Sequence, residues 1–176
     1  MTAPAPRLET ARLILRAHTI DDFEPMAAMW ADPAVTRYIG GRPSARDETW
    51  ARLLRYIGHW AALGYGFWAI EEKQSGRFLG EAGFADFKRA FDPPMIVPEM
   101  GWSLAPAAQG QGYATEAVRA ALAWGDAHFG ASPTRCIIDP ANAASIAVAT
   151  KCGYREIART HYKGEPTILF ERPRLP

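Results

Sequence analysis

The sequence has few cysteines, no long apolar run and almost no net charge. Its two cysteines, Cys136 and Cys152, do not show metal-ligand spacing, so we expect buried free thiols and no metal, with a single disulfide left open. The net charge is +1, with acidic and basic residues mixed along the chain, which argues against a nucleic acid partner. No segment approaches ~18 uninterrupted apolar residues, so no membrane span is expected.

A recognisable targeting segment is also missing. Residues 1–7 are rich in proline and alanine and contain no apolar run of the secretory type, so we expect a cytoplasmic protein. No repeat, low-complexity segment or linker interrupts the 176 residues, of which 48% are hydrophobic and 22% charged. That composition is typical of a globular protein, and the length suits one domain over residues 1–176.

Hydrophobic periodicity is present and changes character along the chain. The first part predicts a strand over 11–18, a helix that Asp32-Pro33 stops, and a second helix from Ser44 or Asp47 to Gly64. The apolar face of that second helix is expected to consist of Trp50, Leu53, Leu54, Ile57 and Ala61. Three strands then follow over 66–72, 78–88 and 99–104.

The remaining segments predict a crossover. A glycine-rich loop at 109–112 leads into a helix, followed by a strand over 134–138, a helix over 142–151 and strands over 154–159 and 167–171. A strand–loop–helix–strand unit makes the strands at 99–104 and 134–138 parallel neighbours. The fold class is therefore α+β: a mixed, mostly antiparallel sheet with one parallel strand pair, flanked by helices.

The glycine-rich loop at 109–112 has the composition of an anion site. Gly110 and Gly112 let the backbone approach a ligand, and the unpaired N–H groups of a first helical turn favour phosphate. A plain glycine-containing loop before a helix is the competing interpretation. The loop lacks the Lys-Ser/Thr ending of a Walker motif, and Thr115 stands where a dinucleotide fingerprint needs a third glycine or alanine.

Several motifs in register resemble one enzyme family. Gln109–Ala114 (QGQGYA) matches the Gln/Arg-x-x-Gly-x-Gly/Ala signature of the GNAT acetyltransferases. Asn142–Ser145 (NAAS) followed by Lys151–Tyr154 (KCGY) is similar to the family's Asn-x-x-Ser…Lys-x-Gly-Phe/Tyr segment. The start LETARLILRAH resembles the subgroup that contains the ribosomal-protein N-terminal acetyltransferases, and the resemblance covers nearly the whole chain.

The resemblance implies a site for acetyl-CoA between two splayed parallel strands. Backbone amides around the glycine loop would hold the pyrophosphate, and the 99–104 strand would pair with the pantetheine arm. Asn142 would contact the same arm, although it also stands where a helix N-cap belongs. The implied cofactor-binding residues are Trp102, Ser103, Leu104, Gln109, Gly110, Gln111, Gly112, Tyr113, Ala114, Thr115 and Asn142.

The catalytic residues are less clearly marked. Glu99, at the start of the strand beside the thioester, is the candidate base, and an exposed strand-end carboxylate is the alternative. Ser145 is the candidate proton donor to the leaving thiolate, although it could equally bond its own helix. Many relatives use a tyrosine in this helix, but the corresponding residue is Ala149. Glu81, Asp86 and His161 are further candidate bases.

The resulting hypothesis is acetyl transfer from acetyl-CoA to a primary amine in a ternary complex, without a metal. The acceptor is a protein N-terminus or a small-molecule amine, and the protein is a monomer or homodimer. Another acyl donor stays open. Because the family tyrosine is replaced by Ala149, a CoA-binding sensor that has lost catalysis is the alternative from a different functional class.

Overall fold

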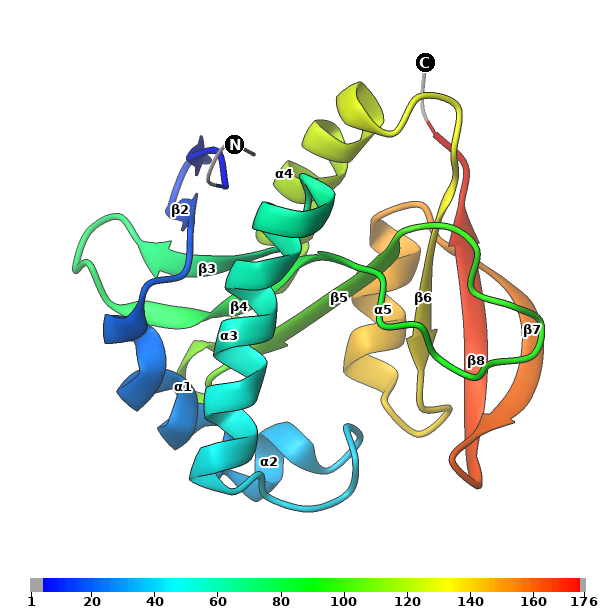
Figure 1. Ribbon diagram of the computed structural model, residues 1–176, viewed down its shortest axis with the longest axis horizontal. Helices are drawn as coiled ribbons and strands as arrows, with labels where there is room; N and C mark the ends of the chain where they lie inside the picture. Colours follow the sequence, from blue (N-terminus) through cyan, green and yellow to red (C-terminus); the bar gives the residue numbers. More distant parts are fainter. Residues whose placement is uncertain (1–4, 175–176) are drawn as a thin grey trace.

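The computed structural model describes residues 5–174, which form one eight-stranded sheet with helices on both faces (Figure 1). The strand order is β1-β2-β3-β4-β5-β6-β8-β7. The strands are β1 (Leu8–Glu9), β2 (Leu13–Arg16), β3 (Phe67–Glu72), β4 (Phe78–Ala85), β5 (Glu99–Leu104), β6 (Thr134–Ile138), β7 (Arg155–Tyr162) and β8 (Glu165–Arg172). The α-helices are α1 (Phe23–Trp30), α2 (Pro33–Thr36), α3 (Arg46–Leu63), α4 (Tyr113–His128) and α5 (Ala143–Lys151).

The predicted fold class is confirmed. Every neighbouring strand pair is antiparallel except β5 and β6, which run parallel and are connected through α4. The crossover follows from the sequence because β5 is followed at once by a turn and by an amphipathic helix.

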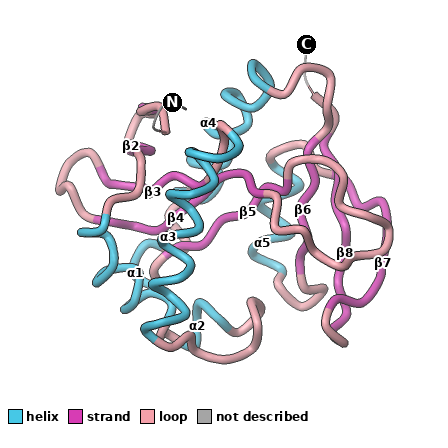
Figure 2. The backbone as a smooth tube through the Cα atoms, in the orientation of Figure 1, coloured by secondary structure: helices cyan, strands magenta, loops and turns pink. Residues whose placement is uncertain are grey.

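Two hydrophobic clusters lie on the two faces of the sheet. One contains α4 residues with side chains from β2, β3, β4 and β6, and the other joins α1, α2 and α3 to Phe67 and Ala85. Figure 1 shows α3 in front of the central strands and α4 behind it. The loop between β4 and β5 runs along the β6–β8–β7 half (Figure 2), where Phe91 packs on Tyr162 and Arg135 donates to the Pro94 carbonyl.

The predicted apolar face of α3 was right at Leu53 and in part at Ile57, but wrong at Trp50, Leu54 and Ala61. The buried residues of this helix are Thr49, Leu53, Tyr56, His59 and Trp60, whereas Trp50 and Leu54 are 40% and 46% exposed. The buried stripe is therefore rotated by about one residue from the predicted one. It contains polar side chains that find partners inside the protein, such as Tyr56, which donates to Glu81 at 2.8 Å.

Other differences concern short elements and strand ends. The β1 strand and the α2 helix were not predicted. Asp32-Pro33 ends α1 but also begins α2, because the Asp32 carboxylate accepts from the Ala34 N–H and proline suits a first helical position. The strand predicted over 78–88 ends at Ala85, and β7 and β8 extend to a turn at Lys163 and Gly164.

The parallel pair separates immediately after it forms. Glu99 pairs with Arg135, and among the described residues it is the β5 residue that pairs with β6. From Met100 to Leu104, β5 stays bonded to β4 on its other edge. The backbone edge of β5 that faces β6 is therefore left open, and the predicted splay is confirmed.

Gly83 lies where two strands come unusually close, and this closeness gives a stability prediction. A Cβ there would press on the Gly66 carbonyl oxygen and the Phe67 Cα, well inside van der Waals contact. Gly83→Ala is expected to lower the free energy of unfolding by about 2–3 kcal/mol in denaturant titration, because backbone atoms must move. As a control, Gly58→Ala on α3 meets no atom within 4 Å and should raise stability by about 1 kcal/mol. Equal effects would contradict the packing argument.

Candidate active site

The glycine loop presents bare backbone at the start of α4. Gly110 and Gly112 have φ of +74° and +81°, a left-handed backbone conformation that residues with a Cβ atom rarely adopt. The Glu116 N–H donates to the Gly112 carbonyl. The amides of Tyr113, Ala114 and Thr115 precede that bond and have no carbonyl partner in residues 5–174, as expected for a first helical turn.

The side chains of this loop are used to hold its shape. Gln109 Nε2 donates to the Leu104 carbonyl at 3.1 Å, and Gln111 Nε2 donates to the Ala107 carbonyl at 2.9 Å. Tyr113 donates its hydroxyl to Glu72 at 2.7 Å and is 6% exposed. The groups left for a ligand are therefore the backbone amides rather than the side chains of these three residues.

A cleft of about 710 Å³ lies beside this helix start. It is mixed in charge, with more basic than acidic residues. Its lining consists of Glu9, Thr10, Arg12, Gly112, Thr115, Glu116, Arg119, Ala120 and Lys151. Three cations beside unpaired amides and the positive end of α4 form a suitable binding site for a polyphosphate.

An ion pair from the turn before β2 supports the cleft. Arg12 forms an ion pair with Glu116 at 2.7 Å, donates to the Gln111 carbonyl at 2.9 Å and lies over the Tyr113 ring. Burial raises the pKa of Glu116, but hydrogen bonds from Thr10 and Arg12 outweigh it and leave that pKa lowered. Arg12 thus ties the N-terminal strands to the loop. These contacts join residues about a hundred positions apart, so local patterns could not have revealed them.

The open edge of β5 is the second part of the candidate site for the acyl donor. Trp102, Ser103 and Leu104 pair with β4 through one edge and present the other to the gap toward β6. The 109–115 loop lies at the end of this edge, because Gln109 donates to the carbonyl of Leu104, the last residue of β5. An extended chain such as pantetheine fits beside such an edge as an added strand.

Comparison with known proteins decides the family. Residues 12–155 match the model of the acetyltransferase (GNAT) domain. The chain belongs to the GNAT acetyltransferase family. It is similar to YkkB of Bacillus subtilis (strain 168), with 32% identity over 94% of this chain and 95% of that protein.

Two further relatives agree with the family assignment. The N-acetyltransferase YoaA of Bacillus subtilis (strain 168) is 29% identical over 86% of this chain and 84% of that protein. A solved GNAT-family acetyltransferase from Bordetella pertussis superposes with a TM-score of 0.83 at 32% identity, covering 96% of this chain and 99% of that one. This GNAT acetyltransferase is thus an acyltransferase that uses acyl-CoA.

Asn142 and Ser145 of this GNAT acetyltransferase meet at the start of α5. The Asn142 Oδ1 accepts from the Ser145 N–H at 3.1 Å, so the N-cap role is present. The Ser145 hydroxyl takes part in none of the hydrogen bonds found among residues 5–174, so bonding to its own helix is not seen. Ala149 is fully buried. Contact of either side chain with CoA stays a prediction.

Glu99 is buried rather than exposed at the end of its strand. It is 4% exposed, and Arg89 Nε donates to both of its carboxylate oxygens, at 2.8 and 3.1 Å. Arg89 itself lies over the Phe87 and Tyr162 rings. Glu99 sits where β5 and β6 part, so it marks the inner end of the gap. Its catalytic role is untested.

The other candidate bases have different surroundings from Glu99. Asp86 pairs with Lys88 at 2.7 Å, and His161 is exposed near the β7–β8 turn. Glu81 is fully buried on β4 and lies opposite Ser103 in the sheet register. Residues 5–174 contain no group of His, Cys, Asp and Glu suited to hold a metal, and Cys136 and Cys152 are free and buried. No described helix is long and apolar enough to cross a membrane.

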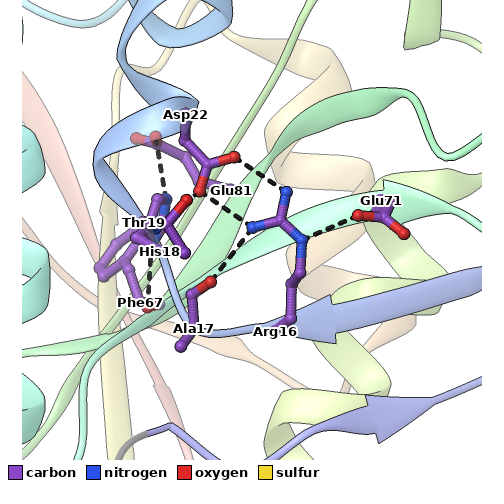
Figure 3. A network of polar contacts seen from close by, with 8 residues as sticks. All are labelled: Arg16, Ala17, His18, Thr19, Asp22, Phe67, Glu71 and Glu81. Atoms are coloured by element: carbon purple, nitrogen blue, oxygen red, sulfur yellow. Dashed lines mark hydrogen bonds and ion pairs between the residues drawn. The ribbon is translucent and has the colours of Figure 1, made fainter.

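Glu81 faces a buried histidine. His18 Nε2 lies 4.0 Å from Glu81 Oε2, and both atoms are buried without a hydrogen-bond partner among the described residues (Figure 3). The other His18 nitrogen contacts the Phe67 carbonyl at 3.3 Å. Burial raises the pKa of Glu81 to about 7 and lowers that of His18 to about 4. His18 is therefore neutral at pH 7.

The raised pKa of Glu81 predicts a pH-dependent stability. The folded protein holds the Glu81 proton more tightly than the unfolded chain does, so the stabilisation present below about pH 4.5 is lost as the pH rises through about 7. Glu81→Gln should raise the free energy of unfolding by less than about 1 kcal/mol at pH 5 and by about 3 kcal/mol at pH 8.

Thermal and denaturant unfolding at the two pH values would test this prediction. Glu165→Gln provides the control, because Glu165 is exposed at the start of β8. A Glu81→Gln effect that is the same at pH 5 and pH 8 would contradict the assigned titration.

Proposed function

We propose that this GNAT acetyltransferase transfers the acetyl group of acetyl-CoA to a primary amine by direct attack in a ternary complex. The observation that carries the proposal is the cleft at the start of α4 together with the open edge of β5, the strand that precedes α4 in the chain. The cleft has cations and free amides for the pyrophosphate, and the edge has free backbone groups for the pantetheine arm.

The proposed reaction uses residues at the two ends of the gap. The amine nitrogen attacks the thioester carbonyl, and a backbone amide of β5 stabilises the oxyanion. Glu99 takes the proton that the amine loses, directly or through water, and Arg89 holds the carboxylate in place. The carbon–sulfur bond then breaks, Ser145 gives a proton to the thiolate, and water returns a proton to Ser145 while Glu99 releases the one it took. The uncommitted Ser145 hydroxyl suits that role.

Thiol release from acetyl-CoA in the presence of a panel of amines tests the proposal. The expected result is acceptor-dependent release of one free thiol for each amide formed, with mass spectrometry identifying the acetylated product. CoA affinity is measured in parallel by calorimetry. Tight CoA binding without turnover on any acceptor would favour a non-catalytic CoA sensor, and no CoA binding would contradict both functions. Propionyl-CoA and malonyl-CoA in the same assay test the choice of acyl donor.

A further inference from the structure

Two arginines on α3 have no acidic partner at ion-pair distance. Arg52 and Arg55 lie about one helical turn apart, and neither forms an ion pair within 4.0 Å with a carboxylate in residues 5–174. Glu81 attracts both charges from further away, but with a pKa of about 7 it is only partly ionised at neutral pH. Arg46, on the first turn of the same helix, pairs with Glu24 at 2.6 Å. The lack of a counter-charge is more costly for Arg52, which is partly buried, than it would be for Arg46, which is exposed to water.

Aromatic rings hold both guanidinium groups in place. Arg52 Cζ lies 3.7 Å from the centroid of the Trp30 ring, and Arg55 Cζ lies 4.8 Å from that of Phe87. The Arg52 Nε–H and the Trp30 Nε1–H are both buried and have no acceptor in full hydrogen-bond geometry among the described residues, although Trp30 lies close enough to Glu81, and Arg52 close enough to Tyr56, to lower the pKa values of those two groups. The neighbours of the Arg52 guanidinium are therefore an aromatic ring, a hydroxyl group and a more distant carboxylate, and no anion of the described chain lies at ion-pair distance.

Positively charged side chains lie close together beside Phe87. Arg55 and Arg89 both lie 4.8 Å from the Phe87 ring centroid. Partial burial lowers the pKa of Arg55 most, Tyr56 and Glu81 raise it, and the positive charges of Arg52 and Arg89 lower it again. Arg89 is neutralised by Glu99, but Arg55 has no such partner. A bound anion would remove this repulsion.

Arg52 and Arg55 lie on the face of the sheet where we expect the acceptor amine, not on the face where we expect CoA. Phe87 and Trp30 belong to the hydrophobic cluster under α3, on the opposite face from the cluster that contains α4. Arg89 connects this cluster to Glu99, at the point where β5 and β6 part. An amine placed at Glu99 would therefore extend along α3 toward Arg55.

We propose that Arg52 and Arg55 bind a carboxylate or phosphate of the acceptor, so that this enzyme acetylates amines that also carry an anionic group. This inference rests on the proposed amine acetylation. The planar, five-donor guanidinium group suits either anion through paired hydrogen bonds. Polycationic amines would be disfavoured by the same two charges.

Matched acceptors test the inference. Amino acids are compared with their amides, and phosphoethanolamine with ethanolamine, so that each pair differs in the anionic group. We expect the preferred acid to exceed its uncharged counterpart in kcat/KM by at least about tenfold. The Arg52→Gln/Arg55→Gln double variant should remove that preference through KM, whereas Arg46→Gln should keep it. Which pair shows the preference distinguishes carboxylate from phosphate. A preference for amides, ethanolamine or spermidine would overturn the inference.

A binding measurement separates this inference from the proposed function. N-acetyl amino acids, N-acetyl amino acid amides and N-acetylphosphoethanolamine are titrated into the CoA complex by calorimetry, which needs no turnover. The best anionic compound should bind at least about tenfold more weakly to the double variant than to the wild type or Arg46→Gln. If no anionic compound binds, or if all three proteins bind it equally, the inference is wrong even when amines are acetylated.

Discussion

Gly112→Val is expected to weaken CoA binding by at least about 100-fold, or roughly 2.8 kcal/mol. Gly112 is the N-cap of α4 and has a φ of +81°, which a β-branched residue resists. A Cβ there would lie 3.4 Å from Arg12 Nη2, at the wall of the cleft. Valine would therefore both disturb the loop amides and fill the space that the pyrophosphate needs. Calorimetry with CoA measures the effect.

The control must separate backbone strain from loss of the site. Gly164 in the β7–β8 turn has a φ of +84°, and a Cβ there meets no atom within 4 Å. Gly164→Val and Gly112→Val should each lower the free energy of unfolding by ~1–2 kcal/mol through backbone strain, but Gly164→Val should leave CoA affinity unchanged. If Gly112→Val binds CoA as tightly as the wild type, the assignment of the loop to the pyrophosphate is wrong.

Glu99→Gln is expected to lower the rate of acetyl transfer by about 100-fold, with CoA affinity unchanged. The carboxamide keeps the shape of the side chain but cannot accept the amine proton. The loss should be largest at low pH, where most of the amine is protonated and removal of its proton limits the rate. The pH profile of kcat/KM for wild type and variant measures this dependence.

Folding must be checked separately, because the Glu99→Gln substitution would leave the Arg89 guanidinium without its counter-charge. Unfolding curves and CoA titrations of the variant provide that check. Glu165→Gln, at an exposed position at the start of β8, is the comparison that should leave the rate unchanged across pH. A rate ratio between wild type and Glu99→Gln that is constant across pH would argue against Glu99 as the base.

The parts predicted well from the sequence depend on local patterns. Alternation and turn residues located β5, β6 and the α4 crossover, and glycines at 110 and 112 marked the left-handed loop. Part of the α3 face was missed because periodicity counts Trp50 as apolar and Tyr56 as polar. In the folded protein the Tyr56 hydroxyl has a buried partner in Glu81, so tertiary contact outweighs the pattern.

The surroundings of the site residues also depend on distant contacts. Glu99 is buried because Arg89 approaches it from the other end of a loop, and the cleft is shaped by Arg12 from the turn before β2. A single sequence shows such residues only as ordinary charges. The two arginines of α3 are similar: their lack of acidic partners at ion-pair distance appears only when neighbouring side chains are in place.

The separation of β5 from β6 divides the sheet into two hydrogen-bonded ladders. One runs from β1 to β5 and the other joins β6, β8 and β7, and a single residue pair connects them in the sheet. Cooperative protection against amide exchange should therefore be interrupted at this seam in the free protein. A bound cosubstrate that bonds to the β5 edge and reaches the α4 amides would connect the two ladders. The fraction of protein with cosubstrate bound would therefore set how rigidly the two ladders are held together.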